Sequence, residues 1–417
     1  MAHESVPPDK PGALAQFRSW FWQRPRAHGE IEAERSVSFL ELFYDLVYVV
    51  VISQAAHHLA GHVSIRGYTE FAIVFALIWI AWVNGTLYYE LHGREDGRTR
   101  TFVFLQMGIL ALLAVFTGDA AGPSAVPFAV VYAVFLVVMT WLWYTIRRHD
   151  RPEYMAVTAR YLTAMVVSFL VIVASILLPT DARLVTWAGF VLGWLALMLI
   201  FGWRSRRRLA LGVVPTESMV ERFDLLIIIV LGEVVVGVVN GLSAVDQDPL
   251  TLATGMLALV VGFGLWWIYF DFAGRRFPRP DGLTLYVWME SHLPFALAIV
   301  GAGAAMVGVI AHAHDASTPT DLAWLLAGSV ALGLLALVGT IRSLADYERH
   351  ASIYRPLIVV MVGGAVGALL VGWWQPVPWL LVAALVAILS ATWVFAVSRF
   401  LAARAWVAEP GDAREVA

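Results

Sequence analysis

Cysteine is absent from this chain, lysine occurs once, and charged residues of either sign are scarce. Without cysteine the protein can form no disulfide bond, thiolate nucleophile or zinc site with sulfur ligands. Lys10 is the only lysine, so arginine carries nearly all the positive charge, a bias that a genome rich in G and C explains better than a function does. The net charge of −3 gives no reason to expect a nucleic-acid partner.

Hydrophobic residues dominate what is present. They make up 60% of the 417 residues, charged residues make up 14%, and the mean hydropathy is +0.75. A soluble domain carries roughly 25% charged residues, so the composition predicts an all-α polytopic membrane protein embedded in the lipid bilayer. The sequence has no P-loop and no nucleophile elbow, which argues against primary transport and against ordinary hydrolysis.

Residues 1–35 are expected to form a cytoplasmic segment rather than a signal peptide. They lack a basic start followed directly by an apolar core and a small-residue cleavage site. Leu14, Phe17, Trp20 and Phe21 recur at helical spacing, which predicts a short helix lying on the membrane surface. A disordered tail with a few aromatic residues is the alternative.

Twelve apolar stretches are long enough, at about 20 residues each, to cross a bilayer as helices. They lie near residues 38–60, 70–92, 101–118, 126–146, 156–178, 184–203, 219–240, 251–272, 291–311, 322–343, 356–374 and 378–400. Arginines cluster in the loops that follow the even-numbered stretches, whereas the other loops hold only Arg66 and Arg183. Because short cytoplasmic loops collect arginine, we expect both termini in the cytoplasm of a bacterial cell, with residues 405–417 as a tail.

The second half of the chain repeats the first. Residues 88–94 (YYELHGR) match 269–275 (YFDFAGR), and TIR occurs at both 145–147 and 340–342. These matches predict two six-helix repeats, 36–210 and 211–404, which are parallel because six is an even number. A path for a solute is then expected where the two halves meet, or between the subunits of a homodimer.

Carboxylates recur in the first span of each half. Glu41 and Asp45 are four residues apart and share one helix face, as do Glu221 and Asp224, three apart. Acids in otherwise apolar spans are costly and are usually retained for a function. Further charges fall at the same depth near the cytoplasmic ends of their spans: Glu90, Asp271, Arg160 and Arg355.

These charges predict one cluster in each half. The expected partners are Arg160 with Glu41, Asp45 or Glu90, and Arg355 with Glu221, Asp224 or Asp271. The alternative is that such pairs only fix helices against each other, or that Glu221 and Arg222 lie in the headgroup layer.

Glu233 differs because the repeat does not duplicate its charge. It lies about 18 Å along the helix from Glu221, near the bilayer midplane, and its counterpart is Ser53 or Gln54. Asn240 follows on the same face. We therefore expect a translocation path along Glu41, Asp45, Gln54, Asp224, Glu233 and Asn240. A protonated acid bonded to a neighbouring helix is the alternative.

Histidines mark two further places. His57 and His58 end one span, and His312 and His314 end another, on the opposite side from the acids. They are weak candidates for a metal or haem site, with solvated helix ends as the alternative, and no cofactor is predicted. Glu290 and His292 open the ninth span as candidate proton carriers, just before Pro294, which predicts a helix start or a kink.

Three strings carry a resemblance to a known family. LELFYDLVYVVVISQAAHHL, ERFDLLIIIVLGEVVVGVV and ESHLPFALAIVG together resemble the bacterial low temperature requirement A family, over residues 36–400. The family name describes a cold-growth phenotype and implies no reaction. Relatives typically carry serine where this chain has Val234, which puts a hydroxyl role there in doubt.

A fainter likeness concerns residues 35–53. Glu41, Phe43, Asp45 and Tyr48 look like the pore-lining first helix of potassium channels with an RxxxFSD signature, although Tyr44 stands where those channels have serine. The first functional hypothesis is therefore a translocator of a proton, an alkali metal ion or a small solute, as a channel or a proton-coupled carrier. The second is a membrane-embedded enzyme or cofactor protein acting on a lipid or binding haem.

Overall fold

The computed structural model describes residues 12–30, 37–204 and 213–402. These residues form thirteen α-helices, one short 3₁₀ helix and no β-strand. Within the described part of the chain, twelve helices are long and apolar enough to cross a membrane. The predicted all-α polytopic membrane protein is confirmed.

The short helix α1 spans Ala13–Phe21. The first half follows with α2 (Phe39–Gly61), α3 (Ile65–His92), α4 (Gly97–Thr117), α5 (Ala125–Arg147), α6 (Met155–Ile176) and α7 (Thr180–Arg204). The second half contains α8 (Glu217–Ser243), α9 (Pro249–Phe272), α10 (Gly282–Ala311), α11 (Thr320–Arg342), α12 (Ala351–Trp374) and α13 (Pro378–Ala402). We call the side of the bundle on which α2 begins and α13 ends the terminal side.

Polar caps start many of the long helices. Ser38 and Glu41 form a reciprocal capping box at the start of α2, which satisfies backbone N–H groups that the helix itself leaves unpaired. Five further helices have an N-cap residue whose side-chain oxygen accepts a backbone N–H group of the first turn. These residues are Ser64, Asp96, Thr216, Asp248 and Asp281. These caps set where each chain segment enters the membrane.

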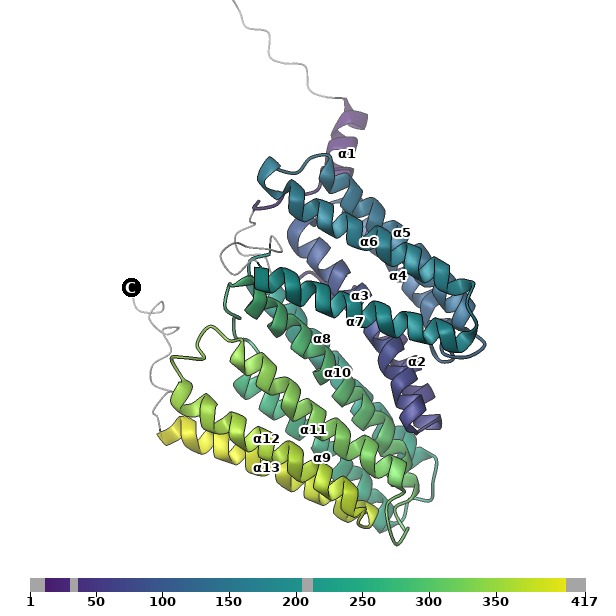
Figure 1. The fold of residues 1–417 in the computed structure, drawn as a ribbon, viewed down its shortest axis with the longest axis vertical. Helices are drawn as coiled ribbons and strands as arrows, with labels where there is room; N and C mark the ends of the chain where they lie inside the picture. The colour runs from purple at the N-terminus through teal and green to yellow at the C-terminus, as the bar shows by residue number, and fades with distance from the viewer. Residues whose placement is uncertain (1–11, 31–36, 205–212, 403–417) are drawn as a thin grey trace, which may run out of the picture.

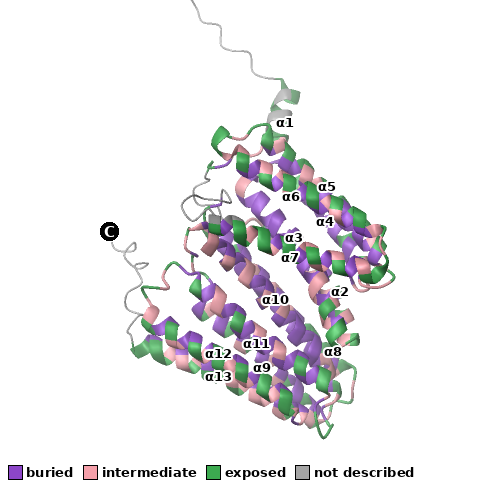
Figure 2. Cartoon of the chain, in the orientation of Figure 1, coloured by how far each residue is buried: buried purple, intermediate pink, exposed green. Residues whose placement is uncertain are grey.

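The two halves lie beside each other and meet along five helices. Figure 1 shows α2–α7 gathered above α8–α13, with α2, α3 and α7 of the first half contacting α10, and α2 also contacting α8. The central helices α3 and α10 are the most buried of the twelve, as the purple ribbon of Figure 2 indicates for α10. A seam between the halves is therefore built from α2, α3 and α7 on one side and from α8 and α10 on the other.

Corresponding helices have corresponding neighbours in the two halves. Helix α5 packs against α4 and α6, as α11 packs against α10 and α12; α2 contacts α3 and α4, as α8 contacts α9 and α10. The duplication itself stays a prediction from the sequence matches. The predicted junction at residues 210 and 211, and the predicted tail 405–417, lie outside the described residues.

The ninth span is longer than predicted. Helix α10 begins at Gly282 rather than near residue 291, because Asp281 caps it by accepting the backbone N–H of Thr284 at 3.0 Å. Pro294 therefore lies inside the helix, not at its start. As a consequence His292 lies about 15 Å into the helix, counted at 1.5 Å per residue.

Residues 22–30, which follow α1, dock onto the terminal side of the first half. Arg26 donates from its guanidinium to the carbonyl of Glu90 at 2.8 Å, and its own carbonyl accepts from His92 at 2.8 Å. His28 is fully buried, bonds Asp150 through its ring Nδ1 at 2.8 Å, and stacks on Tyr154. Helix α1 exposes Leu14, Phe17 and Trp20, and its place on the membrane surface stays a prediction.

Docking of this segment should depend on pH. Burial lowers the pKa of His28 below its ordinary value of 6.5, although Asp150 acts in the opposite direction. A group whose pKa is lower in the docked state favours docking above its ordinary pKa and opposes it as the pH falls through that range. We predict that trypsin cleavage after Arg26, which is 5% exposed, accelerates as the pH falls from about 8 to about 5.5, when its rate is divided by the rate for an unfolded peptide with the same bond at the same pH.

The variant His28→Gln provides the control, since glutamine does not titrate. Its cleavage rate after Arg26, relative to the same peptide, should change less over this range than that of the wild type. A relative rate that is independent of pH in the wild type would contradict the prediction.

Candidate functional site

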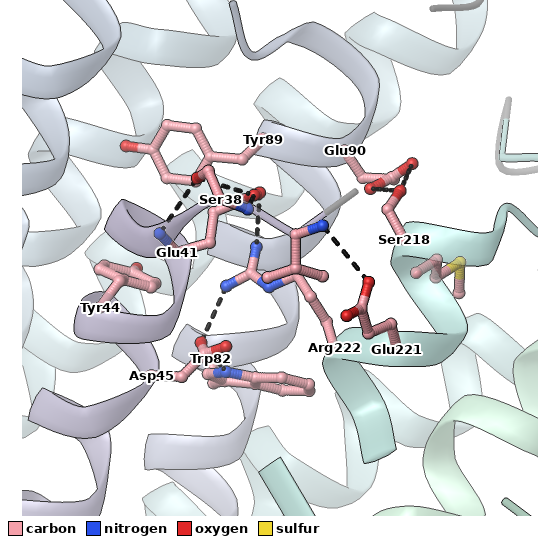
Figure 3. A network of polar contacts seen from close by, with 12 residues as sticks. Ser38, Glu41, Tyr44, Asp45, Trp82, Tyr89, Glu90, Ser218, Glu221 and Arg222 are labelled. Carbon is pink, nitrogen blue, oxygen red and sulfur yellow. Dashed lines mark hydrogen bonds and ion pairs between the residues drawn. The ribbon is translucent and has the colours of Figure 1, made fainter. Parts of the chain in front are cut away.

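A buried arginine joins the two halves near the terminal side. Arg222 of α8 is fully buried, and its guanidinium lies 2.8 Å from Asp45 Oδ1 and 3.4 Å from Glu41 Oε1, both on α2 (Figure 3). Trp82 of α3 donates its ring N–H to the same oxygen of Asp45 at 2.8 Å. Since one cation faces two carboxylates away from water, the removal of Arg222 would leave both carboxylates buried without a compensating charge.

The predicted charge partners were wrong. Arg222, not Arg160, is the arginine that lies between Glu41 and Asp45. Arg160 and Arg355 are both exposed, and Arg355 pairs with the exposed Glu348 at 3.1 Å. The reason is helix rotation: one residue changes the direction on a helix by about 100°, which turns Arg222 towards α2.

The remaining members of the predicted cluster also have other partners. Glu221 is exposed and accepts the backbone N–H of Val37 at 3.3 Å (Figure 3). Asp271 is exposed and accepts from the ring of Trp393 at 2.7 Å. Glu90 accepts the Ser218 hydroxyl at 3.0 Å and so fastens the end of α3 to the start of α8.

Asp224 faces the interior of the second half. Its two oxygens accept from the Tyr269 hydroxyl at 2.7 Å and from the backbone N–H of Arg275 at 2.8 Å. The Tyr269 oxygen also lies 3.0 Å from Nε2 of His292. Asp224, Tyr269 and His292 thus form a buried row from α8 through α9 to α10.

A second buried row runs through the first half. Tyr44 donates its hydroxyl to Gln106 at 2.8 Å and lies 3.2 Å from the hydroxyl of Tyr48, while Gln106 donates to Tyr89 at 2.7 Å. Gly85 is required beneath it, because a Cβ there would lie 2.5 Å from the Tyr44 oxygen. Gln106 was not among the residues predicted from the sequence, although a single amide in an apolar span is a recognisable signal of contact between helices.

Glu233 lies at the inner end of a cavity that opens towards the side opposite the termini. Its carboxylate accepts the hydroxyl of Ser53 at 3.2 Å, and the side chain is 5% exposed. Ser53, Glu233, His57 and Asn240 all line this cavity, which has a volume of about 50 Å³. That is enough for a few water molecules, since one needs about 10–15 Å³.

Close helix packing forms one wall of the Glu233 cavity. A Cβ on Gly237 would lie 2.1 Å from the carbonyl oxygen of Gly303, so only glycine lets α8 and α10 approach this closely.

Gln54, which was predicted to lie on the path with Glu233, does not line this cavity. Ser53 faces Glu233, whereas Gln54 is exposed and lies beside Gly118 of the loop after α4. Consecutive residues on a helix cannot both face the same neighbour.

An aromatic layer separates this cavity from the buried arginine. Phe223 packs against Trp82 at 5.0 Å and against Trp288 at 4.8 Å between ring centroids. Trp79 lies in the same layer and donates its ring N–H to Glu290 at 3.0 Å. A smaller cavity of about 10 Å³ lies on this layer, lined by Tyr48, Trp82 and Val230 among others.

The outer histidines do not converge. His57 is exposed at the cavity, His58 stacks on His62, His312 bonds the carbonyl of Gly308, and His314 pairs with Asp248 at 2.8 Å. Among the residues that the structure describes, no three His, Asp or Glu side chains are grouped as a metal site would need.

Comparison with known proteins gives the family. The model of the bacterial low temperature requirement A protein (LtrA) matches residues 36–394, most of the chain. The chain belongs to the LtrA family. A relative from Rhizobium meliloti (strain 1021), named "Uncharacterized protein RA0937", is 25% identical over 328 residues, which cover 74% of this chain and 76% of that protein. The likeness to potassium channels stays a prediction.

Val234, which stands where LtrA relatives typically carry serine, has a structural role in this chain. Val234 is buried, and its Cγ1 would lie 2.6 Å from a Cβ on Gly262. The position therefore packs α8 against α9, and its side chain provides no hydroxyl beside Glu233.

The buried ion pair should dominate stability at the seam. We predict that Arg222→Gln lowers the free energy of unfolding by about 3–5 kcal/mol, because Asp45 and Glu41 remain buried without their cation. Arg355→Gln, which breaks an exposed pair, should cost at most about 1 kcal/mol. Reversible unfolding in bicelles measures both, and equal losses in the two variants would contradict the account.

Proposed function

We propose that the protein is a cation carrier of the bacterial plasma membrane in which Glu233 binds and releases a proton. The observation that carries the proposal is the position of Glu233, deep in a membrane helix yet lining a polar cavity. An acid this deep is costly when ionised and away from water. Its charge state should therefore follow its access to water.

The seam offers a route from Glu233 to the terminal side. Along α8 the step from Glu233 to Arg222 is eleven residues, about 16 Å. Between them lie the small cavity and the aromatic layer of Trp79, Trp82, Phe223 and Trp288. This packing favours a carrier that opens in turn to each side over a permanently open channel.

The Arg222 ion pair would act as the terminal-side gate. Opening the seam there separates Arg222 from Asp45 and Glu41, so an entering cation or proton can compensate the two carboxylates in place of the guanidinium. Competition of this kind couples occupation to opening, because each state keeps the buried charges compensated. We place the terminal side in the cytoplasm, since short arginine-rich loops gather there.

Flux in proteoliposomes tests the proposal. With an imposed pH gradient, Glu233→Gln should reduce proton movement by about a hundredfold, the order expected for loss of a group that transfers the proton. Glu217→Gln, at an exposed position in the first turn of the same helix, should move protons at the wild-type rate. Parallel measurements with potassium and sodium gradients identify any ion that is coupled.

Wild-type flux in Glu233→Gln would overturn the proposed role of Glu233. Flux that is equally low in Glu217→Gln would show damage to α8 instead. Absence of proton, sodium and potassium flux in the wild type would overturn the carrier itself.

A further inference from the structure

A groove on the outer face of the second half has no role in the seam. It runs between α8 and α9, has a volume of about 450 Å³, and is lined by apolar side chains such as Ile228, Val235, Phe263 and Trp266. These four are 39–51% exposed, so the groove faces the lipid. Its volume falls within the range of about 300–1,000 Å³ that is usual for small-molecule sites.

Two glycines shape this groove. At Gly262 a Cβ would lie 2.6 Å from Val234 Cγ1, so this glycine lets α9 approach α8 at the groove floor. At Gly232 a Cβ would meet no atom within 4 Å. The space beside Gly232 is therefore open and is not needed for packing within the chain.

A chain of ring contacts leads from the groove to a positive charge at the terminal side. Trp266 packs on Phe270 with 5.4 Å between ring centroids, and the guanidinium of Arg275 lies 5.9 Å above the ring of Phe270. Arg275 follows the end of α9, at the level where that helix leaves the membrane. Its backbone is fixed in the left-handed region at φ 58°, with its N–H held by Asp224.

Arg275 differs from the other arginines of its loop. Arg276 pairs with Asp346 at 2.7 Å, and Arg279 donates to the carbonyl of Arg342 at 3.0 Å. Arg275 is exposed and forms no ion pair with any carboxylate in the described part of the chain. Its guanidinium is therefore available to an anion, and phosphate oxygens fit its planar donor pattern.

We infer that the groove holds an acyl chain of a membrane phospholipid whose phosphate pairs with Arg275. The groove supplies an apolar surface along the direction of α9, and Arg275 supplies the complementary charge where that surface meets the headgroup layer. Exposed acids near the same level, Glu221 and Asp271, accept from Val37 and Trp393. The proposed lipid site does not depend on the proposed transport activity.

Native mass spectrometry with added lipid tests this inference. Gly232→Leu should fill the groove without a clash and reduce phosphatidylglycerol binding at this site by about tenfold, because a bulky side chain then occupies the place of the acyl chain. Gly363→Leu is the matched control: this exposed glycine of α12 also has no atom within 4 Å of its Cβ position, and it does not line the groove. Binding in that variant should equal the wild type.

The headgroup contact has its own pair of variants. Arg275→Gln should weaken phosphatidylglycerol about fivefold, the order expected for one arginine near the membrane surface, and should leave diacylglycerol, which has no phosphate, unchanged. Arg355→Gln, an exposed arginine on α12, should weaken neither. Phosphatidylethanolamine in place of phosphatidylglycerol shows whether the phosphate alone suffices.

Unchanged lipid binding in Gly232→Leu would overturn the inference. So would a wild-type dimer that becomes a monomer in Gly232→Leu, since the groove would then be an interface between two copies of the chain. Equal loss of both lipids in Arg275→Gln would overturn the role of the phosphate.

Discussion

The buried ion pair of Arg222 with Asp45 and Glu41 is the constraint on which the seam depends. A guanidinium that is fully enclosed among apolar helices is tolerated only while its carboxylate partners stay within reach. Those partners come from α2, whereas Arg222 comes from α8, so the pair fixes the distance between the two halves. Trp82 adds a bond from α3, and the terminal side of the seam is closed by charge compensation rather than by apolar packing alone.

The rest of the seam is layered above this pair. Next come the aromatic rings around Phe223, then Ser53 with Glu233, and finally a polar cavity that reaches Asn240. The ion pair, the aromatic layer and the Glu233 cavity therefore follow one another along one line between the halves. An arrangement of this kind suits a carrier. Glu233 reaches water from one side while the Arg222 ion pair closes the other side, and opening of the ion pair would reverse this access. The lipid-facing groove beside Arg275 lies away from this line.

The sequence predicted the elements better than their partners. Hydropathy located the twelve spans, and Glu233 was recognised as the unusual acid because its counterpart in the repeat, Ser53, is neutral; the two meet across α2 and α8. The partner of Asp45 could not be predicted, since the choice between Glu221 and Arg222 depends on helix rotation, which hydropathy does not report. The start of α10 was missed because a proline resembles a helix start, although Pro294 lies within the helix.

Accessibility of single cysteines tests the central claim, that water reaches Glu233 from the side opposite the termini while the Arg222 pair closes the terminal side. The chain has no cysteine of its own, so each introduced thiol is read alone with an impermeant maleimide. The account predicts that Ala56→Cys, in the Glu233 cavity, reacts much faster from the opposite side than from the terminal side, because the conformation with the terminal side closed predominates. Val230→Cys, buried at the aromatic layer, should react from the terminal side much faster when combined with Arg222→Gln than alone. Labelling of Ala56→Cys that is equally fast from both sides, or an unchanged rate for Val230→Cys in the Arg222→Gln background, would contradict the account.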